Sequence, residues 1–193
     1  ANYVATYLER DVRQLIAVRD LTQFQRFVRM CAARSGQLLN LSALGADCGI
    51  TAVTAREWLS VLEASYLVAR IPPYFENFGK RLVKTPKLYF LDVGLACWLL
   101  GIRDAESVGT HAMRGALFET WVVSEFIKQQ FNAGRPADLY FWRDNVGHEV
   151  DLLFQTRDGL QAVEIKSGHT FASDWPASAL KRQQRNGRPL APW

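Results

Sequence analysis

The sequence predicts an α+β protein, in which a helical domain of the winged-helix type precedes a second, α/β domain. Two observations support this prediction. Residues 21–100 show a helix, turn and helix pattern followed by two β-like runs, and residues 101–193 show one long helix followed by three β-like runs. With 193 residues, 49% of them hydrophobic, the chain is long enough to form two small cores.

Helical periodicity begins at the N-terminus. Residues 1–20 are predicted to form a connecting helix, because positions 3–19 follow a helical period without glycine or proline. Asp20 and Gln23 have the spacing of a capping box, which predicts a further helix that continues to Gly36.

A helix-turn-helix pattern follows. A short helix is expected to begin near residue 40 and to stop at Gly49, and a longer one is expected over residues 51–64. Two β-like runs at 66–71 and 88–91 suggest a wing, and the basic segment between them extends to Lys87.

This pattern predicts a DNA interface, because the second helix of such a motif enters the major groove. The residues expected to contact bases are Thr51, Thr54 and Arg56, and those expected to contact phosphates are Lys80, Arg81, Lys84 and Lys87. Charge favours the same half: residues 1–92 hold 12 Lys and Arg against 8 Asp and Glu, whereas residues 93–193 hold 11 of each. The alternative is a structural connector with a solvated basic face.

The second domain is expected to begin at residue 101, and residues 101–113 are polar and form the candidate linker. A long helix over 114–131 and β-like runs at 139–142, 149–155 and 160–166 follow. Asp158-Gly159 predicts a hairpin between the last two runs.

Three carboxylates and a lysine form the candidate active site. Glu164 and Lys166 alternate on one predicted strand, so both project from the same face. A two-residue turn places Asp151 opposite Lys166, and a longer loop places it opposite Glu164. Glu119 lies on a stripe of apolar residues along the predicted long helix. Burying a carboxylate there costs free energy unless a cation compensates its charge.

Phosphodiester hydrolysis needs a Lewis acid, an activated water and compensation of negative charge. Asp151, Glu164 and Glu119 are expected to bind Mg²⁺, and Lys166 is expected to orient the water and to stabilise charge. The alternative interpretation is a plain cross-strand ion pair between Asp151 and Lys166.

The order of these residues resembles the PD-(D/E)XK nuclease pattern, and nearly the whole chain resembles the uncharacterised C-terminal domains of prokaryotic AAA+-superfamily ATPases. Segments that carry the second resemblance include KRLVKTPKLYFLDVGLA at 80–96, FWRDNVGHEVDLLF at 141–154 and EIKSG at 164–168. The resemblance implies a parent with an N-terminal ATPase domain that binds ATP, a winged helix and a restriction-endonuclease-like domain. This chain contains no G-x-x-x-x-G-K-[ST] motif, so no ATPase activity is expected from it. Residues 176–193 are polar, which suggests that the nuclease-like domain is incomplete at its C-terminus.

The sequence is therefore compatible with two functions. The first is a DNA-binding module with an Mg²⁺-dependent nuclease-like site, and the second is a non-catalytic protein-interaction or regulatory module on a degenerate nuclease fold. No membrane contact is expected, because no apolar run reaches the roughly 20 residues of a membrane span, and the cysteines predict a cytoplasmic location. The three cysteines have no CxxC spacing, which predicts reduced, structural thiols.

Overall fold

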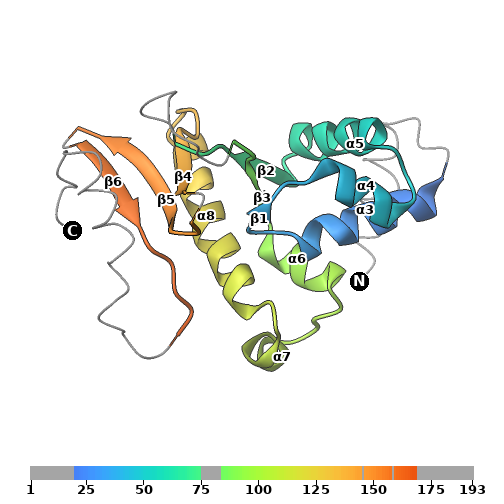
Figure 1. Cartoon of the computed structure of the whole chain (residues 1–193). Coiled ribbons are helices and arrows are strands. Elements are labelled where there is room, and N and C mark those ends of the chain that lie inside the picture. Colours follow the sequence, from blue (N-terminus) through green and yellow to red (C-terminus); the bar gives the residue numbers. More distant parts are fainter. Residues whose placement is uncertain (1–19, 75–83, 145, 158, 169–193) are drawn as a thin grey trace.

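The computed structural model describes residues 20–74, 84–144, 146–157 and 159–168. They form a mixed α+β structure with two small antiparallel sheets (Figure 1). The predicted connecting helix at 1–20 lies, except for Asp20, outside the described residues. In chain order, the elements are α3 (Leu21–Ala33), β1 (Gln37–Leu38), α4 (Leu41–Cys48), α5 (Ala52–Ala64), β2 (Val68–Ile71), β3 (Lys87–Phe90), α6 (Val93–Leu99), α7 (Ala105–Thr110), α8 (Arg114–Asn132), β4 (Leu139–Arg143), β5 (Glu149–Thr156) and β6 (Gly159–Val163).

Side-chain caps fix the ends of the first helices as the sequence predicts. Asp20 caps α3, and its Oδ1 accepts a hydrogen bond from Gln23 N at 3.0 Å. Asn40 caps α4 through Ala43 N at 3.0 Å. Gly49 ends α4 at a φ of 71°, a left-handed conformation that glycine adopts without steric cost.

α5 presents one apolar face to the helical core. Its buried residues are Ala55, Trp58, Leu59 and Leu62. The Trp58 ring packs edge-on against Phe24 and Phe27 of α3, with ring centroids 5.3 and 5.5 Å apart. The predicted helix, turn and helix arrangement is therefore confirmed at the level of its elements.

Thr51 is the N-cap of α5, and its Oγ1 accepts a hydrogen bond from Thr54 N at 3.1 Å. Replacing Thr51 by Ala is expected to lower the free energy of unfolding by about 1 kcal/mol, because one amide loses its cap. Urea denaturation measures this, with Glu57→Ala on the exposed face of α5 as the matched control. An unchanged stability would show that the cap contributes nothing.

The two sheets lie next to each other. The first has the strand order β1-β3-β2 and the second has the order β4-β5-β6. An isolated parallel bridge between Pro73 and Phe141 joins β4 to the end of the first sheet, and Tyr74 N donates to Phe141 O at 2.7 Å. The two halves of the chain are therefore connected by backbone hydrogen bonds.

The cores of the two halves also meet. Ile71, Tyr89 and Leu91 from the first half share one apolar cluster with residues of α8 and of the second sheet. A buried polar junction lies beside this cluster, where Ser35 Oγ is 2.9 Å from Thr120 Oγ1 on α8 and accepts from Phe90 N at 3.0 Å. The boundary between residues 100 and 101 remains a prediction, and α8 packs against both halves.

Two local expectations are corrected, and one short strand was not expected. The predicted linker contains the short helix α7, because Asp104 caps it through Ser107 N at 2.7 Å. The strand β1 lacks a sequence signal, since it has only two residues. The last strand ends at Val163 rather than at Lys166. Beyond that point, the Ile165 amide donates a hydrogen bond to the Asp151 side chain, at 2.7 Å from Oδ2, and not to a neighbouring strand.

Among the described residues, no helix combines the length and the apolar composition that a membrane crossing requires. Cys31, Cys48 and Cys97 are free thiols, as expected, and the first two are buried. Burial raises the pKa of the Cys31 thiol far above its usual value.

Candidate active site at the junction of the two sheets

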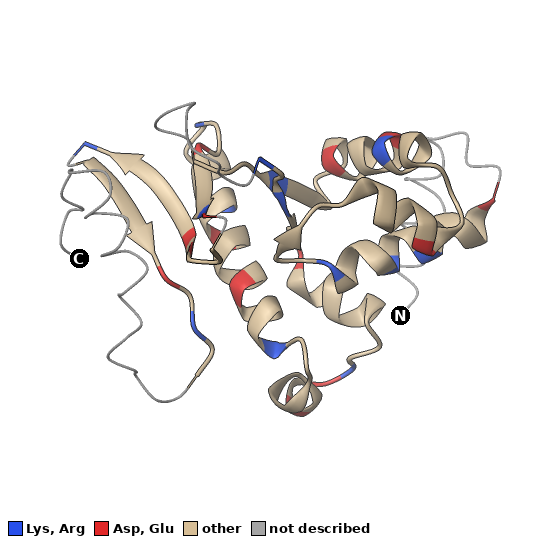
Figure 2. Cartoon of the chain, viewed as in Figure 1, with Lys and Arg blue, Asp and Glu red and all other residues tan. Residues whose placement is uncertain are grey.

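The four predicted site residues line one pocket of about 720 Å³. Glu119 comes from α8, Asp151 from β5, and Glu164 and Lys166 from the segment after β6. Acidic positions on these neighbouring segments are visible in Figure 2. The structure thus brings together all four residues, and it adds Lys87, Arg143 and Glu149 to the lining.

Asp151 is the most buried carboxylate of the site, with 8% of the residue exposed. Its Oδ2 accepts a hydrogen bond from Ile165 N at 2.7 Å and lies 3.7 Å from Lys166 Nζ. Burial is the main cause that raises the pKa of Asp151 to about 6, and the neighbouring carboxylates of Glu119 and Glu164 act in the same direction. The Ile165 amide and Lys166 partly oppose this shift.

Glu164 and Lys166 lie just beyond the end of β6, yet they still reach Asp151. The ladder pairs Gln155 with Leu160 and Thr156 with Gly159, so the first predicted arrangement, with Asp151 opposite Lys166, is wrong. This register continues toward Asp151 opposite Glu164, which is the second of the two predicted arrangements. Lys166 Nζ binds Glu164 Oε1 at 2.6 Å.

One carboxylate oxygen of Glu164 differs from the other oxygens of the site in its hydrogen bonding. Glu164 Oε2 is buried and has no hydrogen-bond partner among the described residues. A buried carboxylate oxygen without a donor is costly, so a cation or a donor at this position would be stabilising. Lys166, by contrast, keeps 40% of its side chain exposed.

Lys87 was predicted to contact phosphate from a wing, and the structure contradicts this prediction. Only 3% of Lys87 is exposed, and its ammonium group forms ion pairs with Glu119 Oε1 at 2.8 Å and with Glu149 Oε1. Burial alone would lower the pKa of Lys87, but the two glutamates raise it above its usual value. Lys87 is therefore a buried cation of the site rather than a surface contact.

Tyr89 follows Lys87 on the same face of β3 and also reaches Glu119. Its hydroxyl donates to Glu119 Oε1 at 2.6 Å. Burial, followed by the charge of Glu119, raises the pKa of Tyr89 well above its usual value, so the phenol stays protonated as a donor. Gly36 also lines the pocket, and its φ of 81° is a left-handed conformation that favours glycine.

The structure groups a different carboxylate triplet from the one the sequence predicts for a metal. Ligand oxygens of Glu119, Glu149 and Asp151 all lie within 4.8 Å of one another. Glu164 lines the same pocket without belonging to that triplet. Glu149 is absent from the sequence prediction, although its spacing of two residues from Asp151 on one strand is a signal that could have identified it.

The turn between β4 and β5 holds the pocket rim in place. Asp144 Oδ1 accepts from the backbone amides of Val146 and His148 at 3.0 and 2.9 Å, and its Oδ2 lies 2.8 Å from His148 Nδ1. Burial opposes ionisation here, but the hydrogen bonds from His148 and Val146 outweigh it and lower the pKa of Asp144 to about 2. His148 lines the pocket next to Glu149.

The predicted DNA interface is described only in part. Thr51, Arg56 and Lys84 are exposed and Thr54 is partly exposed, whereas Lys80 and Arg81 lie outside the described residues. Thr51 Oγ1 and Thr54 Oγ1 lie 2.9 Å apart, so both hydroxyls already take part in the cap of α5. Of the three residues expected to contact bases, Arg56 is the one whose side chain is not used by this cap.

Comparison with known proteins gives two family matches. Residues 1–106 match the model described as Domain of unknown function (DUF8612), and residues 114–191 match the model described as Domain of unknown function (DUF4143). The chain is similar to two uncharacterized proteins, Rv2008c of Mycobacterium tuberculosis and Mb2031c of Mycobacterium bovis. Each is 32% identical over 168 residues, a region that covers 87% of this chain and 37% of the relative. No solved structure matches the chain.

Proposed function

This chain belongs to the family described as Domain of unknown function (DUF8612), and from its geometry we propose a DNA-processing role. In this proposal it is the C-terminal part of an AAA+-like ATPase, in which a winged-helix-type half binds DNA and a nuclease-like half carries an Mg²⁺-dependent phosphodiesterase site. The match of residues 114–191 to DUF4143 supports the ATPase association, since that family often accompanies AAA ATPases. ATP would bind only to the N-terminal part of such a parent, in the cytoplasm.

The observation that carries the proposal is the unpartnered oxygen of Glu164 next to Asp151 in a pocket that also contains Lys166. These donors fit a hard divalent cation, because Mg²⁺ prefers carboxylate oxygens and needs few protein ligands. Asp151 and Glu164 would hold the ion, with Glu119 at the edge of the same pocket. A bound ion would polarise the phosphodiester and lower the pKa of water.

The side chains of this chain supply the remaining requirements. Lys166 can leave Glu164 and place its ammonium group against a phosphate oxygen or a water, because 40% of the side chain is exposed. Glu119 accepts from both Lys87 and Tyr89, so its carboxylate is held in one orientation. Asp151 is oriented by the Ile165 amide.

The direct test is a divalent-ion titration followed by a cleavage assay. Calorimetry with Mn²⁺ measures binding to the 193-residue chain, and labelled duplex DNA with Mg²⁺ or Mn²⁺ measures cleavage by this chain and by the full-length ATPase. We expect ion binding in both proteins and cleavage in at least one of them. Absence of ion binding in both would contradict the proposed function.

The first half is proposed to bind duplex DNA weakly and with little sequence preference. Replacing Lys80, Arg81 and Lys84 by Ala is expected to weaken binding and to flatten the dependence of log affinity on log salt, by about 0.9 for each phosphate contact that is lost. Fluorescence anisotropy over a range of salt concentrations measures both quantities.

A charge-matched control for this experiment removes the exposed Lys128, Arg103 and Arg135, which lie outside the helix-turn-helix segment. This control should keep the affinity and slope of the wild-type chain. If the two triple variants behave alike, net charge rather than a defined surface determines binding. If neither differs from wild type, the first half does not bind DNA through this segment.

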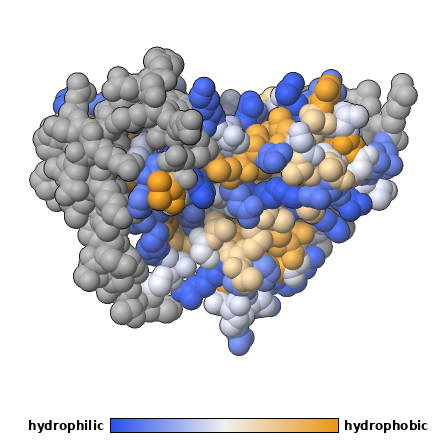
Figure 3. Space-filling view, viewed as in Figure 1, coloured by the Kyte–Doolittle hydropathy of each residue, from blue (hydrophilic) through white to orange (hydrophobic). Residues whose placement is uncertain are grey.

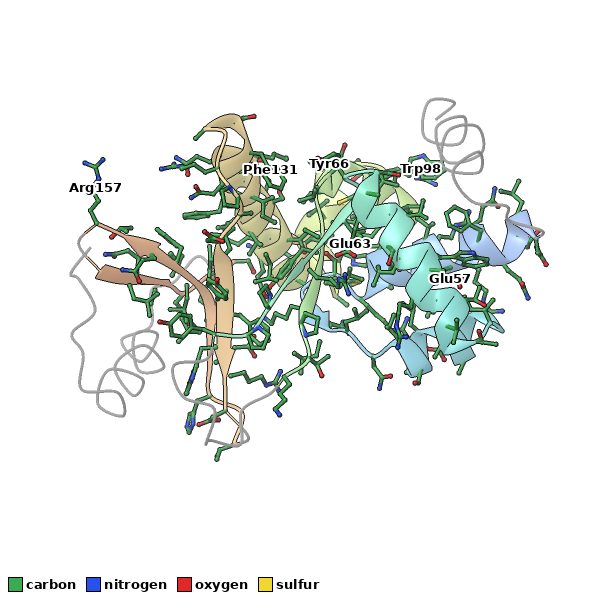
Figure 4. All side chains as sticks on the ribbon, turned by 90° about the horizontal axis from the view of Figure 1, so that it is seen from above. Glu57, Glu63, Tyr66, Trp98, Phe131 and Arg157 are labelled. Carbon is green, nitrogen blue, oxygen red and sulfur yellow. The ribbon has the colours of Figure 1, made fainter. Side chains whose placement is uncertain are left out.

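A non-catalytic interaction or regulatory module is the second candidate, and three observations favour it. Lys87 already forms ion pairs with two carboxylates of the pocket. Tyr66 and Phe131 form an exposed aromatic pair, 69% and 45% exposed, with ring centroids 6.0 Å apart (Figure 4). Apolar patches also reach the surface of the helical half on the face drawn in Figure 3. Two results together would favour this candidate. The full-length protein would co-purify with a partner protein that the Tyr66→Ser variant no longer retains, and calorimetry would detect no ion binding.

A further inference from the structure

Lys87 reaches the pocket from the first half of the chain, whereas every carboxylate of the pocket belongs to the second half. Its ammonium group lies 5.6 Å from the centroid of the Phe141 ring and 6.0 Å from that of the Tyr89 ring, so aromatic side chains shield it. A lysine buried to this degree is rare unless it is paired. Lys87 is thus held in place as part of the site.

Lys87 forms ion pairs with Glu119 and Glu149, and both carboxylates have further donors within this chain. Glu119 Oε1 accepts from Lys87 and from the Tyr89 hydroxyl. Glu149 Oε1 is paired with Lys87, and its Oε2 lies 3.3 Å from Arg143 Nη1. Both side chains therefore have cationic or hydroxyl donors among the residues of this chain.

The other side of the pocket differs. Asp151 and Glu164 share one exposed cation, Lys166, and one oxygen of Glu164 has no partner among the described residues. The pocket as a whole contains four carboxylates against three cationic side chains, so at neutral pH its net charge is negative by one. One divalent ion therefore overcompensates this charge slightly, and a second would leave a strongly positive pocket.

We propose that Lys87 is a built-in cation that takes the place of a second divalent ion between Glu119 and Glu149. Its ammonium group forms ion pairs with both carboxylates. One oxygen of each lies within 4.8 Å of the other and of a carboxylate oxygen of Asp151. The pocket then binds one ion, at Asp151 and Glu164, and the first half of the chain completes the charge balance of the site. The identity of that one ion rests on the proposed function, whereas the role of Lys87 does not.

The test replaces Lys87 and counts bound Mn²⁺ by calorimetry on the whole 193-residue chain. Lys87→Gln keeps a polar side chain of similar length but removes the charge. We expect this variant to bind about one ion more than wild type, because Glu119 and Glu149 then lose the ammonium group that lies between them, next to Asp151. Lys87→Arg is the matched control and should gain no ion, since it keeps the charge. Equal ion counts for wild type and Lys87→Gln would overturn the inference.

Stability gives a second readout in case Lys87→Gln folds poorly. Its thermal midpoint should rise with Mn²⁺ much more than that of wild type, because only the folded chain gathers the three carboxylates. The double variant Lys87→Gln with Glu119→Gln, which removes one charge of each sign, should lose this extra rise. A Lys87→Gln chain that stays unfolded in Mn²⁺ also counts against the inference, since an ion on the same carboxylates should replace the lost charge.

These outcomes separate the inference from the proposed function. If wild type binds no ion but Lys87→Gln binds one, the proposed function fails and the role of Lys87 stands. If wild type binds one ion and Lys87→Gln still binds one, the proposed function stands and the role of Lys87 is wrong.

Discussion

Replacing Lys166 by Met is expected to abolish Mg²⁺-dependent cleavage of DNA while leaving ion binding largely intact. Lys166 contacts Glu164 at 2.6 Å and Asp151 at 3.7 Å, but it is a cation and cannot be a ligand of the ion. Its loss removes a charge that would stabilise the transition state. Removal of one such group typically costs about 100-fold to 1000-fold in turnover. Single-turnover cleavage and calorimetry, done on the same preparation, measure the two effects separately.

Replacing Asp151 or Glu164 by Ala should give a different pattern, with both ion binding and cleavage lost. These two carboxylates carry the oxygens proposed to hold the ion, so neither property should survive without them. Lys128→Met, an exposed lysine on α8 paired with Glu125, is the matched control and should behave like wild type. If Lys166→Met cleaves as fast as wild type, Lys166 has no part in the chemistry and is only the ion-pair partner of Glu164.

Periodicity and capping predicted much of the fold, because both are local. The apolar residues that recur at helical spacing in α5, Ala55, Trp58, Leu59 and Leu62, are the buried ones. The predicted cap at Asp20 forms, and the helices expected near residue 40 and over residues 51–64 begin at the caps Asn40 and Thr51. The long helix and the hairpin follow from the same reasoning, with shifts of a few residues at their ends.

The candidate site was harder to predict where it depends on contacts between distant segments. Lys87 follows a basic run in the sequence, and nothing local distinguishes it from Lys84. Its burial arises because all four residues of β3 are covered, with α8 and the second sheet packed against that strand. Glu149 was missed for the same reason, since its partners Lys87 and Arg143 lie on other strands.

The end of β6 shows a further limit of pattern reasoning. Alternation correctly assigns Glu164 and Lys166 to the side of Asp151, yet regular strand pairing stops before either of them. The Asp151 carboxylate replaces the strand as hydrogen-bond acceptor for the Ile165 amide. The periodicity of a sequence does not show where a side chain competes with the backbone for a hydrogen bond.

Asp151 is expected to reduce the stability of the folded chain, so that Asp151→Asn is more stable than wild type at neutral pH. Burial and nearby carboxylates raise the pKa of Asp151 from its usual 3.8 to about 6. Between these two pH values the folded state holds the proton more tightly than the unfolded state. Stability therefore falls as the pH rises from about 4 to about 6 and stays reduced above that. The pKa difference corresponds to roughly 3 kcal/mol, since each tenfold change in proton affinity is worth about 1.4 kcal/mol.

Urea denaturation of wild type and Asp151→Asn from pH 4 to pH 8, without divalent ions, measures this effect. The stability difference should be largest near pH 8 and should be small near pH 4, where the folded carboxyl is neutral and the unfolded one is only about half ionised. Asp144→Asn should show the opposite sign, because hydrogen bonds from His148 and Val146 lower the pKa of Asp144 to about 2 and its charge stabilises the fold above pH 4. A residue kept at a cost to stability is typical of functional sites. If Asp151→Asn is no more stable than wild type at pH 8, the carboxylate is compensated inside the protein and the argument for a bound cation weakens.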